Sequence, residues 1–234
     1  MKKAWIATGL VLVIGFCSAV GLCVKTLYSP KAVSAMDDSL RIVLDAGHGG
    51  IDGGVVGKKT GVKESDLNLS IVYRLKGKLE DAGFEVTLTR KTEAGLYDTA
   101  LKGFKKRDMQ KRKEIIQAID PALVISVHQN FYPSKNPRGG QVFYAQNSEK
   151  GERFALALQV ELNELYKTVG VSERKIAQGD FFILNCHDCP SVIVECGFLS
   201  NADDEALLAN EVWQNKLADR MTAGVLAYFE NLSV

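Results

Sequence analysis

The segment "ALVISV", residues 122–127, is an apolar run of strand length that only Ser126 interrupts. A strand with one face in water alternates apolar and polar residues, and this run does not. Such a run is typical of a strand buried on both faces, as in parallel sheets that helices cover on each side. The segment therefore predicts an α/β fold for the chain that contains it.

Strand and helix patterns alternate on both sides of this segment. Short apolar runs predict strands, and apolar residues at helical spacing, from Leu67 to Ala82 for example, predict helices. The predicted strands are 41–45, 84–89, 122–127, 140–145, 181–184 and 191–195, and the predicted helices begin at 64, near 109, near 154 and at 211. This alternation is typical of a mainly parallel sheet covered on both faces, in which ligands bind beyond the carboxyl ends of the strands.

The first 24 residues predict a membrane-targeting segment. Lys2 and Lys3 precede the 21 uncharged residues Ala4–Val24, which are enough to cross a bilayer. A cleaved signal peptide usually has a shorter apolar region, although "CSA" at 17–19 would suit a cleavage site, so both an uncleaved anchor and a removed signal remain open. Either one exports the rest of the chain, which we divide into a linker at 25–40 and a catalytic domain at 41–232.

The charge of the exported part excludes some functions. It carries 25 basic and 28 acidic residues, a net charge of −3 for residues 37–234, which gives no reason to expect nucleic-acid binding. One local exception is "KGFKKRDMQKRK" at 102–113, with seven cations in 12 residues. We interpret this run as a solvated helix face, and the alternative is a docking site for an anionic wall polymer or a regulatory protein.

Five cysteines are present, and Cys17 and Cys23 lie in the apolar N-terminal segment. The other three, Cys186, Cys189 and Cys196, allow at most one internal disulfide in an exported domain. "CHDC" at 186–189, with Cys196, could instead form a structural zinc knuckle, but no second CxxC motif is present. We expect free thiols, with the other two alternatives open.

Three predicted strands end in side chains suited to metal chemistry. "DAGHGG" places His48 after the first strand, "SVHQN" places His128 after the third, and "VECGF" places Glu195 at the last. A hydrolytic zinc site takes three ligands from His and carboxylate and leaves a fourth position for water, and Glu64 at a helix start is the third candidate. Taken singly, each histidine could be a structural hydrogen-bonding group and Glu64 a helix-dipole partner. Glu195 would be a buried carboxylate in need of a strong partner, such as a metal.

Five ordered motifs resemble the zinc-dependent N-acetylmuramoyl-L-alanine amidases of the Amidase_3 family. They are "VLDAGHGGIDGG" (43–54), "KESDLNL" (63–69), "LTR" (88–90), "SVHQN" (126–130) and "VECGFLSN" (194–201), and the resemblance covers about residues 40–231. It implies a three-layer αβα sandwich around a twisted, mostly parallel sheet. It also implies one Zn²⁺ held by His48, Glu64 and His128, with Glu195 as the catalytic residue. His187 is then not expected to be a ligand.

The resemblance also implies a substrate and a place of action. Family members cleave the amide between N-acetylmuramic acid and L-alanine in peptidoglycan. The short chain with one N-terminal apolar segment resembles the CwlD-type amidases of endospore-forming bacteria, which strip peptides from the spore cortex before muramic-δ-lactam is made. This predicts an extracytoplasmic protein, membrane-anchored or secreted, in the space around the forespore.

The sequence departs from the family after the second histidine, and it leaves two other functions open. The family often has Asn-Ala there, whereas Gln129, Asn130 and Phe131 follow His128, so Asn130 is either a substrate contact or a turn residue. The rival functions are a zinc peptidase that cuts the stem peptide and a wall-binding module with a degenerate site. Activation by a protein partner is a further expectation that the sequence does not decide.

Overall fold

A computed structural model describes residues 40–134 and 136–232 of the chain. The expected anchor at 1–24 and all of the expected linker except Leu40 lie outside these residues. Within the described part, no helix is both long and apolar enough to cross a membrane.

Six strands form one sheet in the order β2-β1-β3-β6-β4-β5. All neighbouring pairs are parallel except β4 with β6, so the sheet is mixed but mostly parallel, as predicted. The strands are β1 (Arg41–Ala46), β2 (Glu85–Leu88), β3 (Leu123–Asn130), β4 (Gln141–Ala145), β5 (Ala177–Gly179) and β6 (Ser191–Phe198).

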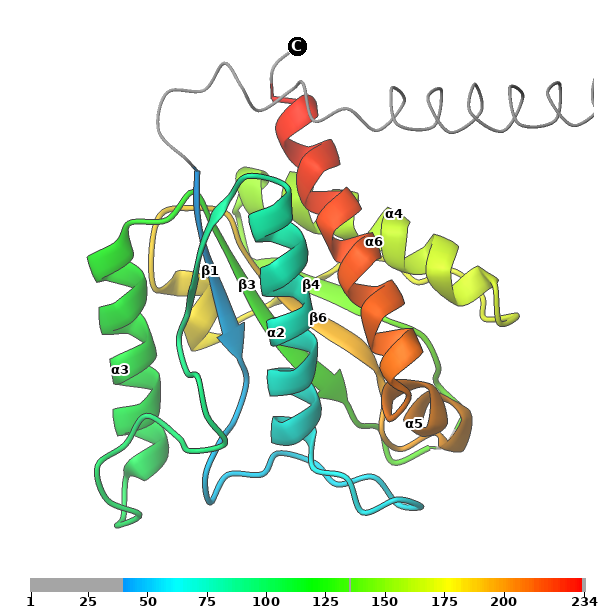
Figure 1. Cartoon of the computed structure of the whole chain (residues 1–234), viewed down its shortest axis with the longest axis horizontal. Helices are drawn as coiled ribbons and strands as arrows, with labels where there is room; N and C mark the ends of the chain where they lie inside the picture. The colour runs from blue at the N-terminus through cyan, green and yellow to red at the C-terminus, as the bar shows by residue number, and fades with distance from the viewer. Residues whose placement is uncertain (1–39, 135, 233–234) are drawn as a thin grey trace, which may run out of the picture. The chain divides into compact units, whose positions relative to one another are not determined.

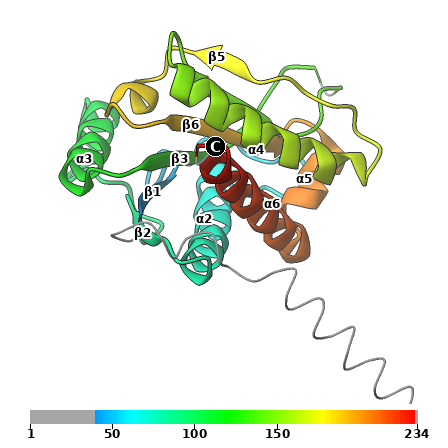
Figure 2. The ribbon, with the colours of Figure 1, turned by 90° about the horizontal axis from the view of Figure 1, so that it is seen from above.

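Helices cover both faces of this sheet and give the three expected layers (Figures 1 and 2). One face is covered by α2 (Glu64–Asp81), α4 (Glu149–Lys167) and α6 (Glu211–Glu230), with the short α5 (Ala202–Leu208) near the end of β6. The other face is covered by α3 (Phe104–Ile119) and the 3-10 helix η1 (Phe182–Asn185). The helices therefore enclose β1, β3 and β6 from both sides.

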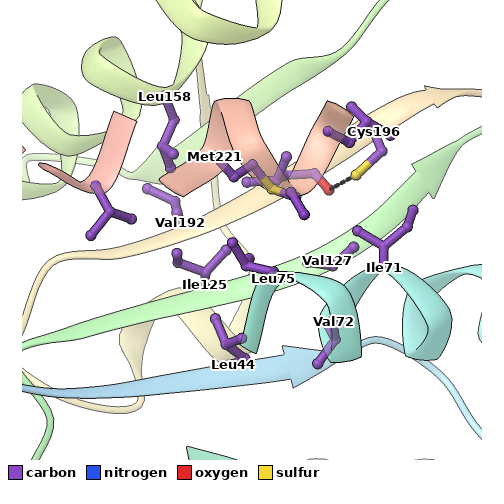
Figure 3. Packing of buried hydrophobic residues seen from close by; sticks show 14 of the residues in the cluster. Leu44, Ile71, Val72, Leu75, Ile125, Val127, Leu158, Val192, Cys196 and Met221 are labelled. Atoms are coloured by element: carbon purple, nitrogen blue, oxygen red, sulfur yellow. Dashed lines mark hydrogen bonds between the residues drawn. The ribbon is translucent and has the colours of Figure 1, made fainter. Parts of the chain in front are cut away.

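The larger core lies between the sheet and α2, α4 and α6. Leu67, Ile71, Leu75 and Leu79 recur every four residues on α2 and are all buried, so this helix presents one apolar face to the sheet. Figure 3 shows Ile71 and Leu75 of α2 in this core, with side chains of β1, β3 and β6 and with Met221 of α6. Burial of this face, more than intrinsic helix propensity, stabilises α2.

The face under α3 and η1 holds a smaller core. It contains Val43, Ile116, Val124, Ile183 and Ile193, with a few further side chains. Residues 181–184 were predicted as a strand, but Phe181 is the N-cap of η1 and the other three residues form its start. Ile183 and Leu184 are buried in the core beside β6, while Phe181 and Phe182 stay exposed. A four-residue apolar run does not distinguish a strand from a buried helical turn, and tertiary packing decides here. The short strand β5 and helix α5 had no clear sequence pattern.

The topology brings three strand ends together. Strands β1, β3 and β6 are adjacent and parallel, and His128 of β3 pairs in register with Glu195 of β6. The register of this pair then shifts between His128 and Asn130. The predicted convergence of His48, His128 and Glu195 at one edge of the sheet follows from this order.

Candidate metal centre

The turn after β1 gives His48 an unusual backbone. His48 has a φ of 61°, in the left-handed region, and Gly49 and Gly50 also have positive φ. Gly47 is needed for a different reason: a Cβ there would lie 2.2 Å from the His128 ring. The glycines of "GHGG" therefore let the turn bend sharply and let the rings of His48 and His128 approach to 5.0 Å between centroids.

Glu64, at the start of α2, joins the two histidines. Its Oε1 lies 3.2 Å from Nε2 of His48 and 3.0 Å from Nδ1 of His128. The three residues offer ligand atoms that all lie within 4.8 Å of one another, and they are the one such group of three or more among the described residues. Two imidazoles and one carboxylate that leave a further position open form a donor set typical of hydrolytic zinc sites.

The surroundings of Glu64 keep it ionised. Burial alone would raise its pKa, but hydrogen bonds with His128 and His48 outweigh burial and hold the pKa of Glu64 well below its usual range. The backbone N–H groups of Val55 and Gln129 also donate to its carboxylate, at 3.0 and 3.1 Å. Gly54 makes room for it, because a Cβ there would lie 2.5 Å from Oε2 of Glu64. A charged, fixed carboxylate between two imidazoles fits a divalent cation.

Glu195 faces the same space from β6. Its Oε2 is buried and has no hydrogen-bond partner among the described residues. Burial raises the pKa of Glu195 to about 7, although nearby His128 acts to lower it. A carboxyl group that can be protonated or ionised near neutral pH suits a general base that later returns the proton.

Asp52 orients the ring of His48. Its Oδ2 lies 3.2 Å from Nδ1 of His48, while Nε2 of the same ring faces Glu64. Lys105 of α3 in turn lies 3.2 Å from Oδ2 of Asp52. A carboxylate behind a ligating histidine fixes the tautomer and the orientation of the ring, so Asp52 would support His48 as a ligand.

Two buried arginines hold the backbone of the His48 turn. Arg112 of α3 donates to the carbonyls of His48 and Ala46, at 2.7 and 2.9 Å, and pairs with the carboxylates of Asp45 and Asp108. Arg90 donates to the carbonyls of Ala46, Gly47, Ser65 and Thr92.

The Asp45 carboxylate also accepts hydrogen bonds from Thr89 and Ser126. Burial alone would raise the pKa of Asp45, but the charge of Arg112 and these hydrogen bonds outweigh burial and lower it.

The structure places the residues that the sequence singled out as follows. It brings His48, Glu64, His128 and Glu195 together, and Asn130 lines a groove beside them. His187 lies elsewhere, with Nε2 3.0 Å from Asp120 and Nδ1 accepting from the backbone of Cys189. Cys186, Cys189 and Cys196 form no disulfide in the described residues, and they do not gather into a group of three or more metal-ligating side chains.

Sequence reasoning missed the supporting residues Asp52, Arg90 and Arg112. It assigned Arg112 to a solvated basic face, but this side chain is 2% exposed and ion-paired. That part of the prediction is wrong, because Asp45 and Asp108 together provide the partners that a buried guanidinium needs. The available signal was Asp45 itself, an acid inside an apolar strand, which demands a buried cation or several donors.

Comparisons with known proteins show the family of this chain. A family model described as N-acetylmuramoyl-L-alanine amidase, Amidase_3, matches residues 42–227. The germination-specific N-acetylmuramoyl-L-alanine amidase of Bacillus subtilis is 34% identical over 191 residues, which cover 80% of this chain and 79% of that protein.

Solved structures show the same relationship. The CwlD amidase of Clostridioides difficile, solved in complex with the GerS lipoprotein, matches with a TM-score of 0.78 and 31% identity, over 82% of this chain and 99% of that one. The catalytic domain of the amidase CwlV from Bacillus (Paenibacillus) polymyxa matches with a TM-score of 0.68 and 28% identity, over 82% and 98% of the two chains. The chain belongs to the Amidase_3 family and is an N-acetylmuramoyl-L-alanine amidase that acts on peptidoglycan.

Proposed function

We propose that this amidase is zinc-dependent, with one Zn²⁺ held by His48, Glu64 and His128 and with Glu195 as the catalytic residue. The observation that carries the proposal is the position of Glu64, whose Oε1 lies within 3.2 Å of a ring nitrogen of both histidines. The unpartnered Oε2 of Glu195 beside this group supports the same reading. The catalytic domain that we propose spans residues 41–232.

The reaction divides between the metal and the protein side chains. Zinc bound here would polarise the scissile carbonyl and lower the pKa of a water toward 7. Glu195 accepts a proton from the attacking water and delivers it to the nitrogen of the departing L-alanine, which is a poor leaving group until it is protonated. A pKa of about 7 allows Glu195 to do both at neutral pH, and a bound cation would lower that pKa and favour the base form.

We propose a role in spore cortex maturation. The support is similarity to the germination-specific amidase of Bacillus subtilis and to the CwlD amidase of Clostridioides difficile. Removal of peptides from muramic acid would precede muramic-δ-lactam formation. The proposed location is outside the cytoplasm, around the forespore, with residues 1–24 serving as an anchor or a signal.

A protein partner is part of this proposal. The solved CwlD amidase forms a complex with the GerS lipoprotein, which supports a comparable partner for the present chain. Such a partner would act on the same amidase domain and would not change the bond that is cleaved.

The test is mass spectrometry of peptidoglycan after digestion with the full-length protein and added zinc. We expect released peptides that begin with L-alanine and intact glycan strands, whereas a peptidase would cut within the stem. Glu195→Gln should abolish release while zinc binding, measured by competition with a chelating dye, stays within threefold of the wild type. If Glu195→Gln keeps the turnover of the wild type, Glu195 is not the general base.

A further inference from the structure

Glu205 of α5 is a buried carboxylate that the proposed reaction does not use. Its side chain is 1% exposed, and it lies in the first turn of α5, the helix that follows β6 and Glu195 in the chain. A carboxylate buried in this way needs hydrogen-bond donors or a cation. The donors of Glu205 come from a distant part of the sequence, the loop at 55–63 that leads into Glu64.

The tip of the 55–63 loop surrounds the Glu205 carboxylate. The backbone N–H of Lys59 lies within hydrogen-bond distance of both oxygens, at 3.0 and 3.2 Å. Thr60 donates twice to Oε1, from its backbone N–H at 2.7 Å and from its hydroxyl at 2.8 Å. Gly57 makes room for this group, because a Cβ there would lie 2.5 Å from Oε1 of Glu205. The loop therefore folds around Glu205 much as a backbone nest folds around a bound anion.

These donors keep Glu205 ionised. Burial alone would raise its pKa, but hydrogen bonds from Thr60 and Lys59 outweigh burial and lower the pKa of Glu205. The 55–63 loop itself contains Lys58, Lys59 and Lys63 and no acidic residue. A carboxylate that α5 supplies therefore also offsets the repulsion among these cations.

Contacts within the loop connect its tip to Glu64. Val56 pairs with Lys63 in an antiparallel bridge at the base of the loop. Next to this bridge, the carbonyl of Val55 accepts from the backbone N–H of Glu64 at 2.9 Å, and the N–H of Val55 donates to Oε2 of Glu64 at 3.0 Å. The position of the Glu64 carboxylate thus depends on a loop whose tip is held by α5.

The base of the loop also forms one wall of the groove at the candidate metal centre. Gly54 and Val55 line this groove, which has a volume of about 360 Å³ and is lined by Glu195 as well. A second contact reaches the tip, where the ammonium of Lys58 lies 5.1 Å from the ring centroid of Phe131. Both of these side chains are exposed, so this contact is weaker than the buried hydrogen bonds of Glu205.

We propose that Glu205 is a positioning residue of this amidase, which holds the tip of the 55–63 loop and thereby fixes the Glu64 carboxylate for metal binding. This inference rests on the proposed zinc site. The alternative is that Glu205 only stabilises the first turn of α5 through the helix dipole.

Asp204 is the matched control for this alternative. It lies in the same turn of α5 and is 0% exposed. Its carboxylate accepts from the backbone N–H groups of Gly139 and Phe198 and pairs with Arg138, all of which lie outside the 55–63 loop. A residue that only stabilises α5 or the domain should therefore behave like Asp204.

The first measurement is hydrogen–deuterium exchange of the full-length protein without metal, followed by mass spectrometry of peptides from residues 55–63. Glu205→Gln keeps the size of the side chain but replaces one acceptor oxygen with an NH₂ group that cannot accept from the loop. We expect exchange in this segment to become about fivefold faster or more in Glu205→Gln. Asp204→Asn should leave exchange in this segment unchanged.

The second measurement is zinc affinity, by competition with a chelating dye. We expect Glu205→Gln to raise the Kd for zinc about five- to tenfold, because the loop no longer fixes Glu64. Asp204→Asn should leave this Kd within twofold of the wild type, although it should lower Tm at least as much, since it also weakens the pair with Arg138. If Glu205→Gln fails to fold, Thr60→Val removes only the hydroxyl donor of an exposed residue and should raise the Kd about threefold.

The proposal is overturned if exchange at 55–63 is unchanged in the folded variant, if its zinc Kd stays within twofold of the wild type, or if Asp204→Asn weakens zinc binding equally. A wild type that binds no zinc refutes the proposed metal site and, with it, the role of Glu205 toward that site. The exchange measurement uses no metal, so it then still shows whether Glu205 holds the loop.

Discussion

Replacement of Arg112 by methionine should be among the most destabilising single changes in this protein. Arg112 is nearly fully buried on α3 and pairs with Asp45 and Asp108 while donating to two carbonyls of the His48 turn. Methionine fills much of the same volume but leaves two carboxylates without their cation. Removal of one partner of a buried ion pair typically costs about 3 to 5 kcal/mol, which would be a large share of the stability of a domain of this size.

Asp45→Asn should cost less than Arg112→Met, and the difference has a structural cause. Without Asp45, Arg112 keeps Asp108 as an ionic partner, and the asparagine oxygen can still accept from Thr89 or Ser126. We expect about 1 to 3 kcal/mol for this change. The double variant Asp45→Asn/Arg112→Met should be more stable than the sum of the two single effects predicts, because it removes one of the two orphaned charges.

Urea unfolding followed by circular dichroism measures these free energies on the full-length protein, and thermal unfolding followed in the same way measures Tm. The measurements are made with a chelator present, so that metal binding does not contribute. For a domain of this size, 1 kcal/mol shifts Tm by about 2 to 4 °C, so Arg112→Met should lower Tm by roughly 6 to 20 °C. A Tm within 2 °C of the wild type, or additive effects in the double variant, would refute the idea that this pair supports the turn.

Three other predictions concern the same edge of the sheet. Asp52→Asn should weaken zinc binding about 10- to 100-fold in a chelator competition, with a change in metal-free Tm below 3 °C, because it loosens the ring of His48 and little else. Gly47→Ala should both lower Tm and weaken zinc binding, since its Cβ would displace His128; an affinity equal to that of the wild type would contradict this. The free energy of unfolding should fall as the pH drops below about 4. The pKa of Asp45 is lowered in the folded protein, so this carboxylate adds its full stability only above the pKa that aspartate has in the unfolded chain. Urea unfolding at a series of acidic pH values measures the effect, and a flat profile would argue against it.

Local patterns were sufficient for most of the sheet and for the residues of the centre. The apolar run at 122–127 and the fourfold spacing of α2 became a doubly buried strand and an amphipathic helix, as expected. His48, His128 and Glu195 could be predicted because each follows or ends an apolar run, and parallel neighbours place such positions at one edge. The strands β3 and β6 extend past His128 and Glu195, to Asn130 and Phe198. Glu64 could be named only as a candidate from its place at a helix start.

Predictions from sequence patterns were wrong where tertiary contacts compete with the local conformational preference of the chain. Residues 181–184 are apolar enough for a strand, yet packing against β6 favours a 3-10 turn, which places Phe182 and Glu195 in the lining of one cavity. Arg112 belongs to a run of cations that is indistinguishable from a solvated helix face along the chain. Its burial depends on Asp45, which lies 67 residues away and cannot be linked to it by spacing.

The sequence alone determined that this protein is an α/β amidase with two histidines and two glutamates at one edge of a sheet, because periodicity and ordered motifs are local properties of the chain. Only the tertiary structure decided which groups support that edge and what surrounds it. Arg112 and Asp52 act across elements, and the cavity at Glu195 is lined by residues of α3, η1 and β6, which lie far apart in the sequence. Contacts of this kind depend on how the layers pack, which no stretch of sequence encodes by itself.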